Sequence, residues 1–503
     1  MEGSDTPRTL LREGVVTMAR RSPGTTRSEK DTLGTMEVPA GALYGAQTAR
    51  AVANFAISGW TLPAGFLSSL ARIKAAFARA NGEHGLLSRE AAQAIATAAD
   101  EVAAGAHLDH FPVDVFQTGS GTSTNMNMNE VLAHLANRVL GGDPAAHRPV
   151  HPNDHVNLGQ SSNDAIPAAL RVAAAVSWRD CVSPAVSGVV SKLRRLAGEH
   201  RVTVTLGRTH LMDAVPTTYG RVIGAWADRL EAALAQGGSA AERLFALPLG
   251  GTAVGSGIGA DRAAVARAAA LLAETTGLAV TLEGNAAAGI AAQDAPIAFA
   301  DALAGVGRVL LAIANDLRLR ASGPFGGLGE LELPAVQPGS SIMPGKVNPV
   351  IPEAVAQVAL EVEGLAAACR ASAALHQLDL SHANPLLAWN LDTMARLLAS
   401  ACDVLVTRCL SGLRVNIERA RSLAAASPAL ATALAARIGY ERAAEVAKAA
   451  EKAGTSVADV ARRLGVLPDD ELAEVLDLAR LAGVEDEPRT EKGHGRAKVK
   501  RKR

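Results

Sequence analysis

The chain has 503 residues, which exceeds one ordinary hydrophobic core and favours two or three domains. Its 50 basic and 50 acidic residues give a formal net charge of zero, which argues against a protein whose overall field attracts nucleic acid or an anionic membrane. Aromatic residues make up only 3% of the chain and long aliphatic segments run without proline, so we expect a mainly α fold.

The two ends of the chain differ in composition from the middle. Residues 1–26 hold mixed charges and no apolar run of signal-peptide length, and Met18 is a possible alternative start. The last segment, 486–503, ends in KGHGRAKVKRKR, which is basic and poor in apolar residues. We predict that both ends are disordered. A localisation or nucleic-acid role for the tail is an alternative, but a solvated tail independent of the fold is favoured.

The cysteines and the apolar segments both indicate a reducing compartment and no membrane span. The cysteines lack CxxC or Cys/His ligand spacing and lie in apolar helical stretches, which favours buried, reduced thiols. Every long apolar segment carries charges, so we predict no transmembrane helix. We therefore expect a cytoplasmic protein that binds neither membrane nor nucleic acid. The cysteines are Cys181, Cys369, Cys402 and Cys409.

Residues 27–160 are predicted to form an N-terminal domain. Within it, 63–104 alternates apolar and charged positions at helical spacing. The chain then becomes polar and glycine-rich at QTGSGTSTNMNMNEV, 117–131, which we interpret as a loop that leads into a helix. A second polar loop, VHPNDHVNLGQSSNDAIP at 150–167, reaches into the next domain.

Residues 161–417 are predicted to form a central domain of long helices. A third polar loop, LGRTHLMDAVP at 206–216, precedes an amphipathic helix that should end near Gly237 and Gly238. After a fourth glycine cluster, LPLGGTAVGSGIG, three segments are apolar on several faces, and we expect them to be buried in a helix bundle. These segments are 296–320, 349–374 and 388–413. Residues 418–485 are predicted to form a small C-terminal helical domain with shorter helices, one of which should stop at Gly454.

The chemistry-bearing side chains concentrate in these polar loops. Ser, Thr and Asn side chains together with amides at a helix start are neutral donors that suit carboxylates, and a lysine adds positive charge. Turn chemistry explains any single loop, but not several loops that pair hydroxyls or amides with His or Lys. A phosphate-binding GxxxxGK[ST] is missing, and GSGIGA at 255–260 lacks the context of a dinucleotide site. The sequence therefore predicts a small anionic ligand.

The stretch GSSIMPGKVNP, 339–349, is the richest of these loops. Its glycines allow successive N–H groups to converge, which lowers the cost of a negative oxygen on Ser340 or Ser341, so that a serine could act as a base. Lys346 and Asn348 could hold a substrate carboxylate while charge builds on it. A tight surface turn is the alternative, but it gives no reason for Lys and Asn beside two serines.

A histidine is the second candidate for proton transfer. His210 lies beside Thr209 in THLMDAVP and could position water or a leaving group, although a lone His is more often structural. Glu353, early in the helix after the lysine loop, is a possible partner for that histidine. Its alternative role is simply that of a favourable acid in a helical first turn.

Together these residues resemble the class II fumarase/aspartase superfamily, whose members eliminate water, ammonia or larger amines from succinyl compounds to give fumarate. The similarity runs from about Arg27 to Leu478, and GSSIMPGKVNP is highly specific to it. The other matching stretches are EKDTLGTMEVPAGALYGAQT, QTGSGTSTNMNMNEV, HPNDHVNLGQSSND, GRTHLMDAVP, LPLGGTAVGSG and IGYERAAEVAK. The resemblance implies three mostly helical domains, with long helices of the central domain forming a homotetramer core. It also implies active sites shared between subunits, a small dicarboxylate substrate, and no metal or organic cofactor.

The resemblance further assigns roles to residues. Ser340 matches the catalytic base on a mobile loop, with Lys346 and Asn348 as the carboxylate-binding pair. His210 matches the second catalytic position and Glu353 its charge partner. The remaining substrate-binding positions are Ser120, Thr122, Ser161, Ser162, Asn163, Thr209 and Ser341. A secondary anion site matches His151, Asn153 and Asp154.

GSGT at Ser120, SSND at Ser161 and THLMD look more like fumarase than aspartase, so the favoured activity is fumarate hydratase, the reversible loss of water from (S)-malate. An aspartate ammonia-lyase or another carbon–nitrogen lyase is the alternative. A catalytically silent scaffold with a partner-binding tail is a third hypothesis. The sequence departs from the family's usual residues at Phe325, at Arg221 and in the segments 284–296 and 377–381. These departures leave the identity of the substrate open.

Overall fold

The computed structural model of the chain describes residues 25–484, which divide into two compact units. Unit 1 contains the described residues up to Ala173, together with Ala246–Gln293 and Ala374–Trp389. Unit 2 contains Ala174–Phe245, Asp294–Ala373 and the described residues from Asn390 onward. The predicted disordered ends lie outside the described residues, apart from Thr25 and Thr26. The boundaries of the three predicted domains stay a prediction.

Unit 1 is organised around helix α2 (Ala64–Glu83), which packs against α3 (Arg89–Ala103) and α8 (Arg262–Thr276). The predicted helical region 63–104 is thus two helices, because the chain turns after α2 and Ser88 caps α3 by accepting the N–H of Ala91. Small residues allow the close approach of α2 and α3: a Cβ on Gly82 would lie 2.6 Å from the Ala92 methyl.

The other helices and strands of unit 1 surround this core. Helix α4 (Thr122–Val139) begins inside the stretch 117–131 and packs on α3, so a short loop leads into a helix there, as predicted. Helix α5 (Ser162–Ser177) begins in this unit. The remaining elements are β1 (Thr26–Asp31), β2 (Gly34–Pro39), α1 (Ala46–Asn54), β5 (Ala246–Leu247), β6 (Thr281–Leu282), α9 (Ala286–Ala291), β8 (His376–Gln377) and β9 (Leu380–Ser381).

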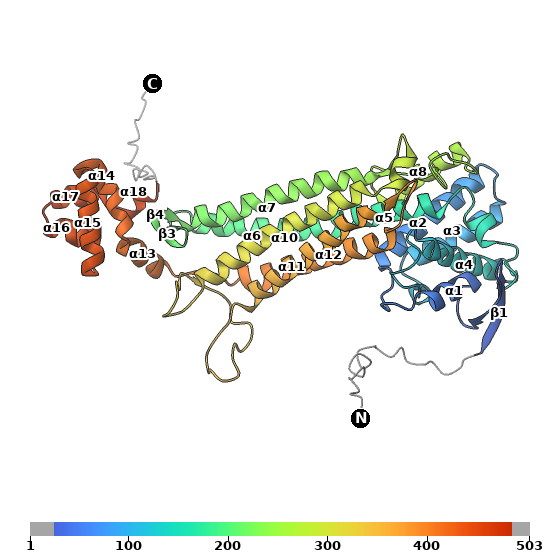
Figure 1. The fold of residues 1–503 in the computed structure, drawn as a ribbon, viewed down its shortest axis with the longest axis horizontal. Helices are drawn as coiled ribbons and strands as arrows, with labels where there is room; N and C mark the ends of the chain where they lie inside the picture. Colours follow the sequence, from blue (N-terminus) through green and yellow to red (C-terminus); the bar gives the residue numbers. More distant parts are fainter. Residues whose placement is uncertain (1–24, 485–503) are drawn as a thin grey trace, which may run out of the picture. The chain divides into compact units, whose positions relative to one another are not determined.

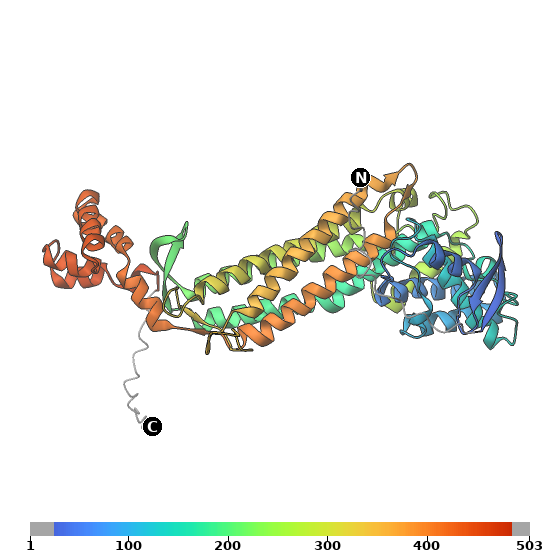
Figure 2. The same cartoon turned by 60° about the horizontal axis from the view of Figure 1, so that its bottom comes forward.

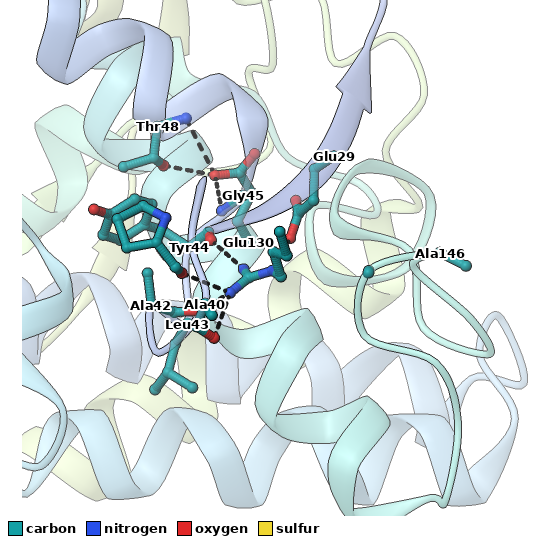
Figure 3. Close-up of polar contacts among 12 residues, drawn as sticks. Glu29, Ala40, Ala42, Leu43, Tyr44, Gly45, Thr48, Glu130 and Ala146 are labelled. Carbon is teal, nitrogen blue, oxygen red and sulfur yellow. Dashed lines mark hydrogen bonds and ion pairs between the residues drawn. The ribbon is translucent and has the colours of Figure 1, made fainter. Parts of the chain in front are cut away.

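A buried carboxylate fixes the start of α1 in unit 1. Glu130 of α4 accepts the backbone N–H groups of Gly45, Gln47 and Thr48 and the hydroxyl of Thr48, and Figure 3 shows its carboxylate pointing into this turn. A helix start leaves its first backbone N–H groups without a partner inside the helix, and the Glu130 carboxylate accepts them here. Glu130 therefore holds the segment before α1 in place.

Unit 2 is built on long helices that run side by side (Figures 1 and 2). Helix α10 (Asp294–Arg320) packs on α7 (Tyr219–Glu242) and α11 (Val350–Ala371), and α7 also packs on α6 (Ser183–Glu199). Helix α12 (Asn384–Leu405) joins them through Asn390, which lies 3.7 Å from Cys369 Sγ of α11. The mainly α fold with a bundle of long helices is confirmed.

Two local predictions in unit 2 were wrong. Residues 206–216 form most of a hairpin of β3 (Val204–Thr209) and β4 (Met212–Thr218), because Val204 and Leu206 are buried and the two-residue turn His210–Leu211 has positive φ at both positions. Helix α7 continues past Gly237. That glycine is a packing position, since its absent Cβ leaves room for the Trp178 ring.

A cluster of short helices forms the C-terminal part of unit 2. Its buried core includes Leu434, Val446, Val457 and Val460, and Leu206 of β3 packs into the same core. Helix α15 ends at Gly454, which has φ +60°, as predicted. The elements are β7 (Leu331–Glu332), β10 (Arg414–Val415), α13 (Ile417–Ala426), α14 (Ala431–Ile438), α15 (Tyr440–Ala453), α16 (Val457–Arg463), α17 (Asp469–Val475) and α18 (Leu478–Leu481).

Among the described residues, one helix is long and apolar enough to cross a membrane by length and composition. This helix, α10, reaches a mean hydropathy of 1.9, and 50% of its most apolar window is buried within the described chain. Cys369, Cys402 and Cys409 are buried, as predicted, and burial raises the pKa of each thiol. The expectation of burial was wrong for Cys181, which lies in a short π-helix (Trp178–Val182) and is exposed.

Candidate active site

The N-terminus of α5 presents the candidate residues Ser161, Ser162 and Asn163. Ser161 is the cap of this helix: its Oγ accepts the N–H of Asn163 at 3.2 Å, and its carbonyl accepts that of Ala165. Asp164 reaches back and accepts the N–H of Ser161 at 2.9 Å, which completes a capping box. The positive end of a helix dipole and polar side chains thus lie together, as a carboxylate ligand requires.

The N-terminus of α4 lies against α5 and presents Ser120 and Thr122. Their hydroxyl oxygens are 2.8 Å apart. Gly121 between them has φ +80°, and a Cβ there would lie 2.7 Å from the Ile166 side chain of α5. A glycine at this position therefore permits both the left-handed backbone and the approach of α4 to α5. The structure brings these two predicted groups together within unit 1.

The loop of residues 339–348 in unit 2 closes on itself. The N–H of Gly339 donates to the carbonyl of Lys346 at 2.9 Å, and Asn348 Nδ2 donates to the carbonyl of Gly339 at 2.6 Å. The Oγ of Ser340 accepts the N–H groups of Ile342 at 3.2 Å and Met343 at 2.9 Å. The expected convergence of N–H groups therefore occurs at Ser340 and not at Ser341, which is exposed.

A positive charge borders this loop. Lys346 is exposed, and within residues 25–484 its ammonium makes no hydrogen bond or ion pair. A hollow of about 510 Å³ lies against the loop, and Ser340, Met343 and Lys346 are among the residues that line it. A lysine and a hydroxyl that already accepts two N–H bonds thus line one hollow, and both groups favour negative charge there.

Thr209 and His210 lie at the tip of the β3–β4 hairpin in unit 2, and both are exposed. His210 has φ +54° and occupies the first position of the turn. Glu353 is half-buried in the first turn of α11. Among the described residues, no hydrogen bond or ion pair joins His210 to Glu353, so their predicted partnership is not made within one copy of the chain.

A buried carboxylate fixes the hairpin that carries His210. Glu330 is fully buried and accepts bonds from both terminal nitrogens of Arg208 at 3.1 Å, from the hydroxyl of Tyr219 at 3.1 Å, and from Arg320 at 3.3 Å. The side chain of Thr205 adds a fifth donor. Because Arg208 directly precedes Thr209, this bidentate pair holds the hairpin near its tip against the end of α10.

The candidate secondary anion site lies at a short π-helix (Pro152–Val156) in unit 1. Its cap is His151, whose Nδ1 accepts the N–H groups of Asn153 at 3.3 Å and Asp154 at 3.2 Å. Asn153 and Asp154 are exposed. The three predicted residues therefore lie together at a helix start, where the His151 ring itself accepts the N–H groups of Asn153 and Asp154.

Two buried charged residues of unit 1 were missed in the sequence. Lys74 is fully buried, and burial lowers its pKa to about 7. Asp164 is also fully buried, and burial raises its pKa to about 6 against the opposing effect of the N–H groups that it accepts. The signal for Asp164 was its spacing of three residues after Ser161, the spacing of a capping box. The burial of Lys74 could have been inferred from Leu70 and Phe77, which are apolar and lie on the same face of the helix.

Two of the sequence departures receive a physical explanation. Arg221, at the start of α7, donates to the carbonyl oxygens of Ala482 and Gly483 and so ties the end of α18 to α7. Residues 377–381 lie in a tight hairpin whose turn residue Leu378 is 96% exposed. Phe325 is 97% exposed, and nothing in the structure explains it. Segment 284–296 includes α9 and the start of α10. Nothing in the structure explains why it departs from the residues usual in the family.

No group of three or more His, Cys, Asp or Glu side chains in residues 25–484 is arranged to hold a metal ion. The candidate residues of unit 1 are hydroxyls and amides at helix N-termini, and those of the loop in unit 2 are hydroxyls, an amide and one lysine. Such groups bind and stabilise carboxylates without covalent chemistry of their own.

Comparison with known proteins places the chain in a family. Residues 34–364 match the family model described as a lyase, and residues 430–483 match that of the fumarase C C-terminus. A class II fumarate hydratase of Xylella fastidiosa is 45% identical over 455 residues, which cover 90% of this chain and 95% of that protein. The chain therefore belongs to the fumarase/aspartase superfamily of lyases.

Solved structures agree with this assignment. A class II fumarase from Schistosoma mansoni has a TM-score of 0.88 and 34% identity, covering 91% of this chain and 99% of that one. A fumarate lyase:delta crystallin from Brucella melitensis, in a structure with bound cobalt, has a TM-score of 0.88 and 41% identity and covers 91% of this chain and all of that one. Both likenesses extend over nearly the whole described chain.

Proposed function

We propose that this protein is a fumarate hydratase of class II, which catalyses the reversible elimination of water from (S)-malate to give fumarate. The observation that carries the proposal is the environment of Ser340 Oγ, which accepts two backbone N–H bonds and lines the same hollow as Lys346. N–H donors and a nearby positive charge lower the cost of a serine oxyanion. The membership of the chain in a lyase family supports the same reaction.

In the elimination, the oxyanion of Ser340 takes a proton from C3 of malate. The electron pair left on C3 delocalises into the adjacent carboxylate, whose added negative charge Lys346 and Asn348 stabilise. Expulsion of the C2 hydroxyl then forms the double bond of fumarate. His210, with Thr209 beside it and Glu353 as its charge partner, protonates the departing hydroxyl so that it leaves as water.

The second carboxylate of the substrate binds at the paired helix N-termini of unit 1. The hydroxyls and amides there suit a planar anion, and the helix dipoles add positive potential. Ser341 of the serine loop contributes to substrate binding as well. The groups in unit 1 are Ser120, Thr122, Ser161, Ser162 and Asn163, and His151, Asn153 and Asp154 hold a second anion outside the reaction.

The protein functions as a homotetramer with active sites shared between subunits, in the cytoplasm and without a nucleic-acid or membrane partner. Two observations support self-association. Helix α10 is strongly apolar, but only half of its most apolar window is fully buried in a single chain, and most of the rest is half-buried. No hydrogen bond or ion pair joins His210 to Glu353 within the described residues of one copy, so another copy can supply the partner.

Absorbance of fumarate, followed with malate and with aspartate in separate reactions, tests the proposal. We expect the purified protein to form fumarate from malate and not from aspartate, and to consume fumarate in the reverse direction. Fumarate from aspartate alone would instead identify an ammonia-lyase. No turnover of any succinyl compound by a correctly folded protein would favour a silent scaffold.

A further inference from the structure

The glycine cluster of residues 249–259 has no place in the proposed reaction, yet a buried carboxylate ties it to the substrate-binding segment. Asp164 is fully buried at the start of α5. Its Oδ1 accepts the N–H of Ser161 at 2.9 Å. Its Oδ2 accepts the N–H groups of Gly250 at 3.1 Å and Thr252 at 2.9 Å. One carboxylate therefore holds two chain segments, with one oxygen for each.

The glycine-rich loop is itself held in a strained conformation. Thr252 has φ +54°, a left-handed backbone that a β-branched residue rarely adopts, and it is buried. Gly251 has no room for a side chain, since a Cβ there would lie 2.6 Å from Ala286. The carbonyl of Ala253 accepts Asn163 Nδ2 at 2.8 Å, a second direct bond to the substrate-binding segment. Strain of this kind persists only where surrounding contacts enforce it.

A second buried charge, Lys74, supports the same segment through the residues that precede Ser161. The ammonium of Lys74 donates to Asn157 Oδ1 at 2.9 Å, and Asn157 Nδ2 donates to the carbonyl of Gln160 at 3.1 Å. Gln160 directly precedes Ser161. The positive charge of Lys74 also favours the ionised form of Asp164, which is the form that accepts N–H bonds on both oxygens.

We propose that Asp164 is a positioning residue that locks Ser161–Asn163 onto the loop of residues 250–253, and that this lock sets the affinity of the site for the substrate carboxylate. The inference rests on the proposed function, which assigns Ser161–Asn163 to the substrate. It adds a role for the glycine-rich loop, which holds the binding segment without touching the reacting atoms.

Asp164→Asn tests the lock because an amide offers one acceptor oxygen in place of two. Its carbonyl can serve either Ser161 or the glycine-rich loop, while its NH₂ faces an N–H on the other side. The matched control is Glu130→Gln. Glu130 is also a buried carboxylate that accepts three backbone N–H groups, but the segment it holds, 45–48, contains no candidate substrate-binding residue (Figure 3).

We expect Asp164→Asn to raise KM for malate and the dissociation constant for succinate about 10-fold or more, with a much smaller change in kcat. Succinate is a dicarboxylate without a leaving group, so its binding, measured calorimetrically, needs no turnover. Glu130→Gln should lower thermal stability but leave both constants within about 2-fold of the wild-type values. Equal effects of the two variants, or no change in either constant for folded Asp164→Asn, would overturn the lock.

Hydrogen exchange on the wild-type protein gives an answer even where Asp164→Asn does not fold. Saturating succinate should slow exchange in peptides that cover 250–253 as well as in those that cover 161–165. Protection confined to 161–165 would contradict the lock. Succinate binding with the expected protection but without malate turnover would refute the proposed function alone, whereas a wild-type protein that binds no dicarboxylate would refute both.

Discussion

Ser340 and Ser341 are neighbours with different surroundings. Both lie between the glycines at 339 and 345, and the sequence alone left open which of them could carry negative charge. In the folded loop only Ser340 Oγ accepts N–H bonds among the described residues, from Ile342 and Met343. The distinction depends on which way each side chain points, and a run of residue types does not encode that direction.

Burial of ionisable side chains was the hardest residue property to predict. Asp164 and Glu330 are buried because each is surrounded by donors from segments far away in the chain. Local sequence shows the residue but not its distant partners. The motifs therefore led to predictions for Lys346 and Asn348, which stay predictions, but gave no sign of the buried carboxylates that hold neighbouring segments.

His134 in α4 gives a pH-dependent prediction. Burial, with the nearby charges of Arg27 and Arg138, lowers its pKa to about 4 from the usual 6.5. Between these two values the unfolded chain binds a proton that the folded chain does not, so acid favours unfolding, and the stability from this group is lost as pH falls from about 6.5 to about 4. Thermal midpoints of the wild type and His134→Gln at pH 7.5 and 5.0 should show a smaller loss for the variant. An equal or larger loss would contradict the assignment.

At the scale of elements, sequence periodicity located the long helices and missed the hairpin. Residues 296–320 and 349–374 correspond to α10 and α11 within a few residues, because aliphatic residues without proline continue a helix until its ends. LGRTHLMDAVP looked like a loop because its turn residues, His210 and Leu211, are not those of usual type I′ turns. Contacts to Glu330 and the C-terminal core stabilise this hairpin.

Arg221 joins two elements, which leads to a second prediction. Its guanidinium donates to carbonyls at the C-terminal end of α18. The helix dipole favours a positive charge at that end. Arg221→Gln should lower the free energy of unfolding by about 1 kcal/mol while leaving kcat and KM for malate unchanged. Chemical denaturation and steady-state kinetics measure the two effects. A change of substrate preference in this variant would show that Arg221 acts in the pocket and not as a structural tie.

At the scale of the whole molecule, the fold class and the bundle followed from composition and helical spacing, and the superfamily followed from its motifs. The division of the chain did not follow as directly. Each unit is assembled from separated segments, so that Ala246–Gln293 belongs with the N-terminal part of the chain. Such interleaving depends on long-range packing, for example that of α8 on α2, which local patterns do not report.

The proposed homotetramer, with active sites shared between subunits, predicts complementation. Ser340→Ala and His210→Asn each remove one catalytic group and should each have low activity as pure proteins. If the two groups of one site come from different chains, mixed tetramers will contain some sites with both groups intact. Activity should therefore rise when the variants are unfolded together and reassembled, and remain low when each is reassembled alone. No rise in proven mixed tetramers would place both groups in one subunit.

The central claim is that Ser340 removes the proton of malate, and the rate of fumarate formation by Ser340→Ala tests it most directly. The control is Ser191→Ala, at an exposed position of α6. We predict that Ser340→Ala forms fumarate from malate roughly 10²–10⁴-fold more slowly than the wild type, with an unchanged circular dichroism spectrum and assembly state, while Ser191→Ala keeps the wild-type rate. A wild-type rate in Ser340→Ala would contradict the account.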